Sequence, residues 1–309
     1  MSNRASRPTL GRENHPIATE LAFAVCAVGG FALWHHTAST VASSAVDALS
    51  LPGGLPVEGL LGGSLLLAGS FLFAGAYVTL RDIEVGVALP SADDLPLVGV
   101  AIALPAVLVG LTKFVGALTG VPYGSLTMTA VAADVPLEPF LVVTGLGLFV
   151  GVPSYLLTCQ VVVQGSLGRV TDGDIAVVAT TAVASFLLLS ARGGLSPFPE
   201  RGRLGGAVLF VATIGVALFA ADRVGRRWLR ALSYLPALVL FGVAALSGVA
   251  AVESVAGGLF VTTQVAVLGL AAYAYDRTDS LLVPALAYAS LLATGQAVVF
   301  VFEAGVQGW

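Results

Sequence analysis

Long apolar runs are the feature that most constrains what this chain can fold into. Each approaches the roughly 20 residues that an α-helix needs to cross about 30 Å of hydrocarbon. With 57% hydrophobic and 10% charged residues, the 309-residue chain has too little polar surface for a water-soluble globule. The sequence therefore predicts an all-α polytopic transmembrane bundle of about eight or nine helices. The runs lie at 17–38, 59–80, 96–119, 139–165, 174–191, 206–221, 231–252, 255–275 and 281–302.

The basic residues predict how the bundle is oriented, because short cytoplasmic loops are enriched in Lys and Arg. Three Arg residues precede the first run, so residues 1–16 are expected to form a cytoplasmic tail of a cell-membrane protein. Alternation then places Arg81, Arg169, Arg277 and the Arg cluster at 223–230 on the same side. The loops at 47–58 and 121–138 contain no Lys or Arg and are expected outside. One loop departs from the rule, because Arg192, Arg201 and Arg203 fall on the predicted outer side.

The chain is expected to form a single membrane domain, with N-terminal helices at 17–138 and a second region at 139–309. No repeat of fixed period and no long polar insertion separates the runs. Residues 51–61 contain two Pro and several Gly, which predicts a broken segment at the outer surface. The lipid bilayer is the expected partner. Nucleic acid is not expected, because the net charge is −4 and the basic residues are divided among loops.

Few titratable groups fall inside the predicted helices. Lys113 is expected to reach toward the outer surface, with an interior ion pair as the alternative. Glu20 and Glu303 lie at the ends of predicted helices, where water or lipid headgroups can solvate them. His35 and His36 follow Trp34, which is typical of an interfacial anchor, and consecutive residues on a helix point too far apart to chelate one ion.

The most distinctive motif is the stretch from Ala274 to Leu292, which reads AYDRTDSLLVPALAYASLL. It resembles the last conserved block of the CPBP intramembrane proteases, also called type II CAAX prenyl endopeptidases or the Abi family. That block is a turn of the form Tyr-x-Arg-Thr-x-Ser-Leu, followed by a helix reading Pro-x-Leu-x-His-x-x-x-Asn. The turn is intact here. Tyr288, however, stands at the position of the active-site His, and Leu292 at that of the Asn.

A second stretch, at the end of the fourth apolar run, is similar to the first block of the same family. The family reads Glu-Glu-x-x-x-Arg, then Gly-x-x-Gln-Gly and a basic turn. Gln164, Gly165 and Arg169 match the downstream half, although Val161 replaces the first Gly. The likeness therefore covers roughly residues 139–292.

The catalytic half of that first block is replaced. Counting back from Gln164 puts Tyr155 and Leu156 on the two Glu positions and Gln160 on the Arg position. The resemblance implies that the first Glu activates a metal-bound or positioned water and that the Arg holds the carboxylates. Neither a phenol nor an alkyl chain replaces a carboxylate base near neutral pH.

The family's middle block, Phe-x-x-x-His, can be placed in two ways. Phe186 with Ser190 keeps the usual separation from the first block, and Phe241 with Ala245 keeps the usual separation from the last. The first placement is preferred. In either case the His is missing, and all three His residues of the chain precede residue 40.

The resemblance thus implies an intramembrane metalloprotease scaffold whose catalytic groups are absent, so no catalytic residue, metal or cofactor is expected. The family fold implies a polar cavity within the bilayer, lined here by Tyr155, Gln160, Ser190 and Tyr288. We expect it to hold a membrane-embedded or lipidated polypeptide without cutting it. Two alternatives remain open, which are an active endopeptidase with an unorthodox site and a small-molecule permease. The sequence does not indicate an oligomeric state.

Overall fold

A computed structural model describes residues 16–49, 54–190, 194–223, 228, 232–250 and 252–305, and this part of the chain is helical. Two isolated β-bridges are the extended pairings among these residues. The helices are α1 (Pro16–Leu49), α2 (Gly54–Arg81), η1 (Ala92–Asp94), α3 (Leu95–Thr119), α4 (Tyr123–Thr127), α5 (Leu137–Tyr155), η2 (Leu156–Gln164), α6 (Gly165–Leu167), α7 (Gly173–Leu188), α8 (Arg201–Arg223), α10 (Leu235–Ala250), α11 (Val255–Thr278) and α12 (Leu282–Glu303).

In the described part of the chain, seven apolar helices are long enough to cross a membrane, which confirms a polytopic membrane protein. The count of eight or nine spans is therefore only partly met. The two remaining apolar runs form α7 and α10, each a helix of 16 residues. At about 1.5 Å per residue such a helix rises roughly 24 Å, less than the hydrocarbon thickness. The spans are Ile17–Ser44, Gly59–Arg81, Ala92–Thr119, Leu137–Leu167, Arg201–Ala220, Val255–Thr278 and Leu282–Glu303.

The predicted broken segment at 51–61 is wrong for the part that the structure describes. Residues from Gly54 onward already belong to α2. Pro56 lies in the first turn of this helix, where its missing N–H has no intrahelical acceptor in any case. Residues 51–53 lie outside the described part of the chain.

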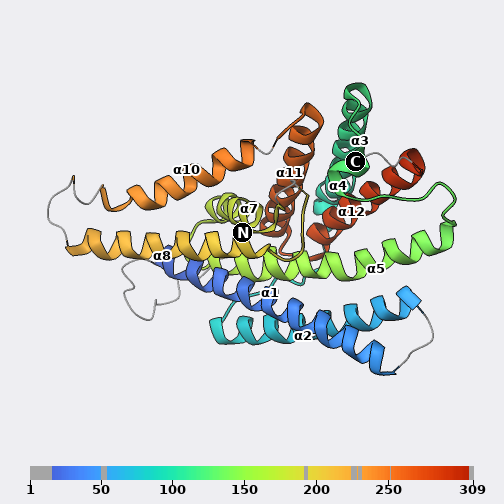
Figure 1. The fold of residues 1–309 in the computed structure, drawn as a ribbon. Coiled ribbons are helices and arrows are strands. Elements are labelled where there is room, and N and C mark those ends of the chain that lie inside the picture. Colours follow the sequence, from blue (N-terminus) through green and yellow to red (C-terminus); the bar gives the residue numbers. More distant parts are fainter. Residues whose placement is uncertain are drawn as a thin grey trace.

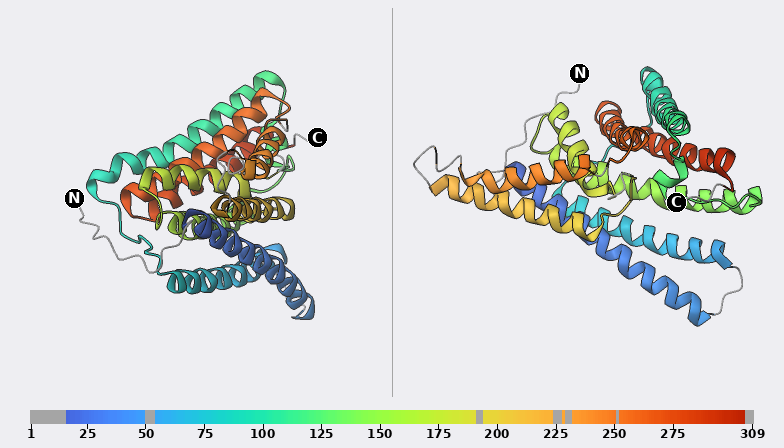
Figure 2. Two further views of the ribbon diagram at one scale, coloured as in Figure 1. Left: turned by 90° about the vertical axis from the view of Figure 1, so that its left-hand side faces the viewer. Right: turned by 45° about the horizontal axis from the view of Figure 1, so that its top comes forward.

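The helices form a splayed bundle in which α11 and α12 hold the centre (Figure 1). α11 packs against α3, α7 and α12, and α12 packs in turn against α3 and α5. α1 and α2 lie together along one edge, while α8 and α10 lie together along another (Figure 2). The buried side chains of α11 and α12 face this centre and place residues of the last motif inside the bundle.

At one end of the bundle, the turn between α11 and α12 fastens onto the connection between α2 and α3. The Tyr275 hydroxyl accepts a hydrogen bond of 2.9 Å from the Gly86 N–H. Ser280 forms an antiparallel bridge with Val87. A Cβ at Gly86 would clash with the backbone carbonyl of Asp279, so only glycine permits this approach. Asp279 ends α11 in a left-handed conformation, and the N-cap residue of α12 makes no side-chain cap hydrogen bond.

At the other end, Glu303 is buried and paired, contrary to the expected solvation by water or headgroups. Its side chain is 4% exposed and forms an ion pair with Lys113 of α3. Its two carboxylate oxygens also accept hydrogen bonds from the Tyr123 N–H at 2.7 Å and the Gly124 N–H at 2.6 Å. The alternative of an interior ion pair for Lys113 is therefore confirmed, and it ties α3, α4 and α12 together.

The Arg residues that break the positive-inside pattern have a structural explanation in Arg203. Its guanidinium donates to the carbonyls of Phe186 at 3.3 Å and Ser190 at 3.2 Å. These carbonyls lie at and just after the C-terminal end of α7, where intrahelical donors run out and the helix dipole favours a cation. Arg201 is exposed, and Arg192 lies outside the described residues.

The orientation stays a prediction that labelling can test. In a background in which Cys26 and Cys159 are replaced by Ser, we expect Glu138→Cys to react with an impermeant maleimide added to intact cells. Asp174→Cys should react only after permeabilisation, because Asp174 is 89% exposed near the opposite end of the bundle, beside Arg277. Labelling of position 174 from outside would reverse the predicted topology.

The Lys113–Glu303 pair predicts a large loss of stability on substitution. Glu303→Ala leaves the Lys113 charge without its partner and two backbone N–H groups without an acceptor, so we expect a loss of about 3 kcal/mol. Equilibrium unfolding in mixed detergent micelles measures the change. Glu138→Gln, at an exposed acidic residue, serves as the control and should change the free energy of unfolding by less than about 0.5 kcal/mol. Equal effects of the two variants would contradict a stabilising role for the pair.

Candidate functional site

The residues that sequence analysis singled out begin where α5 passes from α-helical into π-helical geometry. The π-helical segment η2 spans Leu156–Gln164 and follows Pro153, which has no N–H to give to the α-helical ladder. In a π-helix the N–H of residue i+5 bonds to the carbonyl of residue i, so more residues occupy each turn. Residues four and five positions apart then flank the same face. This geometry brings Tyr155, Cys159 and Gln160 toward the same neighbour.

That neighbour is Tyr288 of α12. The rings of Tyr155 and Tyr288 lie with their centroids 5.2 Å apart and their planes tilted by 32°. The Gln160 side-chain amide donates to the Tyr288 hydroxyl at 3.1 Å. All three side chains are 2% exposed or less. The structure therefore brings together three positions that the sequence alignment placed in one site, on α5, η2 and α12.

A segment after α7 completes the surroundings of Tyr155. The Tyr155 hydroxyl donates to the carbonyl of Leu195 at 3.0 Å. The chain reaches this position by folding back on itself, with Leu189 bridged to Leu195 and the Ser190 N–H donating to the Gly194 carbonyl at 2.7 Å. Ser190 is thus half-buried in this turn and is not on a helix, contrary to the expectation, because α7 ends at Leu188.

The remaining predicted site residues surround the tyrosine pair less closely. Leu156 and Leu292 are half-buried apolar side chains on η2 and α12. The Leu292 side chain packs against Gly151. A Cβ added to this glycine would lie 3.2 Å from a methyl carbon of Leu292. Phe186 lies against Gly206 of α8. Its ring therefore faces α8.

The other placement of the middle motif receives less support from the structure. Phe241 is 63% exposed, and α10, which carries it, packs against α8. The side chain of Ala245 lies outside the described part of the structure. α7 packs directly against η2 and α11, so the Phe186 and Ser190 placement is the one next to the tyrosine pair.

Two members of this cluster were not identified from the sequence. Cys159 supplies the thiol beside the Tyr288 hydroxyl, and Leu195 supplies the acceptor for Tyr155. Cys159 directly precedes Gln160, and consecutive residues of a helix point in different directions, so the motif gave no reason to place both beside Tyr288. A backbone carbonyl leaves no signal in the sequence at all.

The cluster can donate and accept hydrogen bonds, but it does not fit a metal ion. Phenol and amide groups are not among the usual ligands of zinc, which takes thiolate, imidazole or carboxylate. Within the described ranges, no group of three or more His, Cys, Asp or Glu side chains comes together. Two buried amide oxygens, Oε1 of Gln160 and Oε1 of Gln164, have no hydrogen-bond partner. The nitrogen of Gln164 donates to the Ala272 carbonyl on α11 at 2.8 Å.

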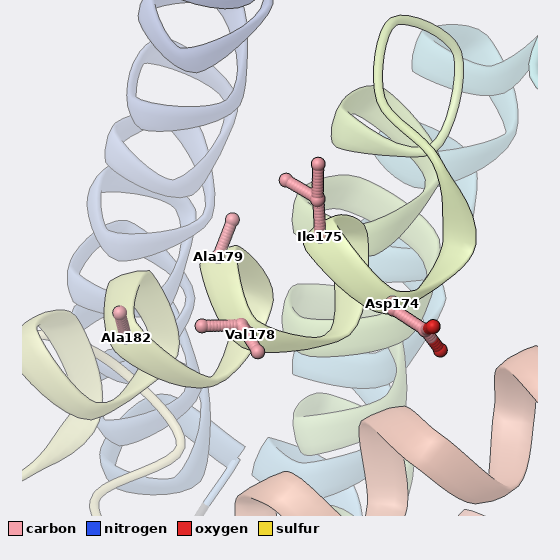
Figure 3. A pocket seen from close by; sticks show the side chains of 5 residues that line it. All are labelled: Asp174, Ile175, Val178, Ala179 and Ala182. Atoms are coloured by element: carbon pink, nitrogen blue, oxygen red, sulfur yellow. The ribbon is translucent and has the colours of Figure 1, made fainter.

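A separate hollow on the surface lies along one face of α7 (Figure 3). Ile175 and Val178 on this face are 55% and 69% exposed. The surface of the hollow is almost wholly apolar, so it suits lipid chains and offers no polar chemistry. The residues that line it are Asp174, Ile175, Val178, Ala179 and Ala182.

No protein-family model, curated protein or solved structure matches the chain.

The hydrogen bond between Gln160 and Tyr288 gives a direct test of the cluster. Tyr288→Phe removes the acceptor of a fully buried amide, and we expect a loss of about 1–3 kcal/mol in the free energy of unfolding. Tyr273→Phe is the matched control, because Tyr273 is 42% exposed on the neighbouring helix α11. Unfolding of both variants in mixed micelles should separate them. Equal stability of the two variants would show that the buried pair contributes nothing.

Proposed function

We propose that this chain is a proteolytically inactive relative of the CPBP intramembrane proteases, which holds a membrane-embedded or lipidated polypeptide without cutting it. The observation that carries the proposal is the meeting of Tyr155, Gln160 and Tyr288 inside the bundle. These positions were aligned from two separate motifs, 128 residues apart for Gln160 and Tyr288. Positions that derive from one ancestral active site must lie in contact, as these positions do.

The spacing within the first block supports the same view. The family places its first Glu and its Arg five residues apart, at the positions of Tyr155 and Gln160 here. The π-helical segment η2 brings residues of this spacing to one face. The helical geometry of η2 is thus compatible with a site built on this spacing.

The conserved turn also supports the proposal, because its residues have structural roles. Tyr275 binds the backbone of Gly86, and Ser280 pairs with Val87. Arg277 lies 3.7 Å from Asp174, at the start of α7. Gln164, from the first block, donates to α11 immediately before this turn. The residues that resemble the family most closely are thus those that hold helices together.

The chemistry of the cluster argues for binding without hydrolysis. A hydrolase of this type needs a general base close to neutral pH, together with an electrophile or metal ion. Tyr155, Gln160 and Tyr288 provide neither. Ser190 would need an adjacent base to act as a nucleophile. Its backbone carbonyl instead accepts a hydrogen bond from the Arg203 guanidinium.

Photocrosslinking of a lipidated peptide tests the binding. A benzophenone amino acid placed at Leu156 or Leu292 lies beside the tyrosine pair, and we expect it to capture a fluorescent prenylated peptide in proteoliposomes. The same group at Val301 of α12 is the control, because this position is 65% exposed and lies 13 residues beyond Tyr288. Unlabelled peptide in excess should suppress capture at 156 and 292. Equal capture at all three positions would contradict a specific site.

Cleavage is tested separately with the same peptide. We expect no product with or without added zinc, measured by mass spectrometry after prolonged incubation with the purified full-length chain. Metal-dependent cleavage that a chelator abolishes would overturn the inactive assignment, even if crosslinking succeeds.

A further inference from the structure

A second polar cluster lies apart from the tyrosine pair, where three segments meet near the start of α1. Glu20 of α1 is buried, with a side chain 6% exposed. One of its oxygens, Oε1, accepts from the Arg81 guanidinium at 2.6 Å and from the Arg169 guanidinium at 3.2 Å. Arg81 ends α2, and Arg169 follows α6 by two residues. Two cations therefore share one oxygen of one carboxylate.

This arrangement leaves hydrogen-bonding capacity unused. Two guanidinium groups against one carboxylate leave one excess positive charge. Each guanidinium carries more N–H donors than it uses with Glu20. Among the residues that the structure describes, the buried Nε of Arg81 has no hydrogen-bond partner, and neither does the second oxygen of Glu20. The cluster is thus incomplete on its own.

The two arginines are nevertheless accessible from outside the bundle. Their side chains are 24% exposed for Arg81 and 37% for Arg169. Arg81 is also fixed in place, because its guanidinium carbon lies 3.9 Å from the centre of the Phe23 ring. A ligand from outside the bundle could therefore reach a guanidinium group that is already held in position.

The cluster lies at the ends of helices that are long enough to cross a membrane, where lipid headgroups are expected. Glu20, Arg81 and Arg169 all lie at ends of apolar helices, within or next to predicted spans. Leu80 beside Arg81 is 85% exposed, and Ile17 in the first turn of α1 is 52% exposed. Exposed apolar side chains next to a charged cluster suit a molecule with a charged head and an apolar tail.

Two acidic residues and two hydroxyl groups lie near the arginines in the chain or in space. Asp82 and Glu84 follow Arg81 and are exposed. Ile83, between them, is buried. Its side chain packs so closely against Gly165 that a Cβ on this glycine would clash with it. Tyr77 and Ser166, bonded to each other at 2.7 Å, add neutral hydroxyls on the inner side.

We propose that Arg81 and Arg169 form a binding site for an anionic phosphate group, supplied by the headgroup of an acidic phospholipid. Guanidinium groups bind phosphate through paired N–H donors, and they do so more specifically than ammonium groups. Basic pockets between transmembrane helices bind acidic headgroups in this way. Glu20 then acts as the residue that holds both guanidinium groups in position.

Binding of a fluorescent phosphatidylglycerol to the purified chain in neutral detergent micelles tests this site. We expect saturable binding that Arg169→Gln weakens about tenfold, since a hydrogen bond to a charged group contributes about that much. Arg169→Lys should bind with intermediate affinity, because it keeps the positive charge but loses the paired N–H donors of the guanidinium group. Arg277→Gln is the matched control, because its side chain is 54% exposed and its ion pair is with Asp174, which is not part of the cluster. It should bind like the unmodified chain.

The source of the phosphate is tested by competition. Phosphatidylglycerol without the label should displace the probe, phosphatidylcholine should displace it poorly, and inorganic phosphate should do so only at far higher concentration. Displacement by inorganic phosphate at the concentration of the lipid would overturn the lipid as the ligand. Unchanged affinity in Arg169→Gln, with thermal unfolding in neutral micelles showing an intact fold, would overturn the site itself. If Arg169→Gln does not fold, Arg169→Lys must still show the partial loss of affinity expected for it, and full affinity there would overturn the proposal.

Discussion

The constraint on which this structure depends is that polar groups in hydrocarbon need partners within the protein. Several contacts between helices follow from it. The Trp34 indole donates to the Leu66 carbonyl at 2.9 Å and joins α1 to α2. Thr112 and Thr263 lie 3.3 Å apart and join α3 to α11. Since lipid tails give helices no hydrophobic reason to associate, such bonds, together with close packing at small residues, decide which helices are neighbours.

The same constraint explains which charges occur inside and what they do. Glu303 satisfies two backbone N–H groups at the start of a helix of five residues, and Lys113 neutralises it. Arg203 satisfies carbonyls at the end of α7, a helix too short to cross the membrane. In both places a charged side chain serves backbone groups that the ends of short helices leave open. At these two places charge follows interruptions of the helical backbone, which a rule based on loop position alone does not describe.

The helical class and the places of the apolar helices were predictable, because hydropathy over about 20 residues reports a physical length. The contact between Gln160 and Tyr288 was also anticipated, since two motifs pointed to one site. The partner of Glu303 was not, because Lys113 lies 190 residues away and no local spacing connects them. The turn at Ser190 was missed for another reason. An apolar run continues to Leu189, while α7 stops at Leu188 and the chain folds back to meet Tyr155.

The π-helical segment shows why the positions of residues in a sequence do not fix which side chains meet. Sequence spacing gives residue positions, but their directions depend on the number of residues in each turn. With α-helical geometry, Tyr155 and Gln160 would point about 140° apart, as five steps of 100° require. With η2, both reach Tyr288, and Cys159 joins them. Pro153, in the helix just before this segment, is the one sequence signal that the α-helical ladder is interrupted there. It indicates where the geometry changes, and the packing against α12 shows what the change achieves.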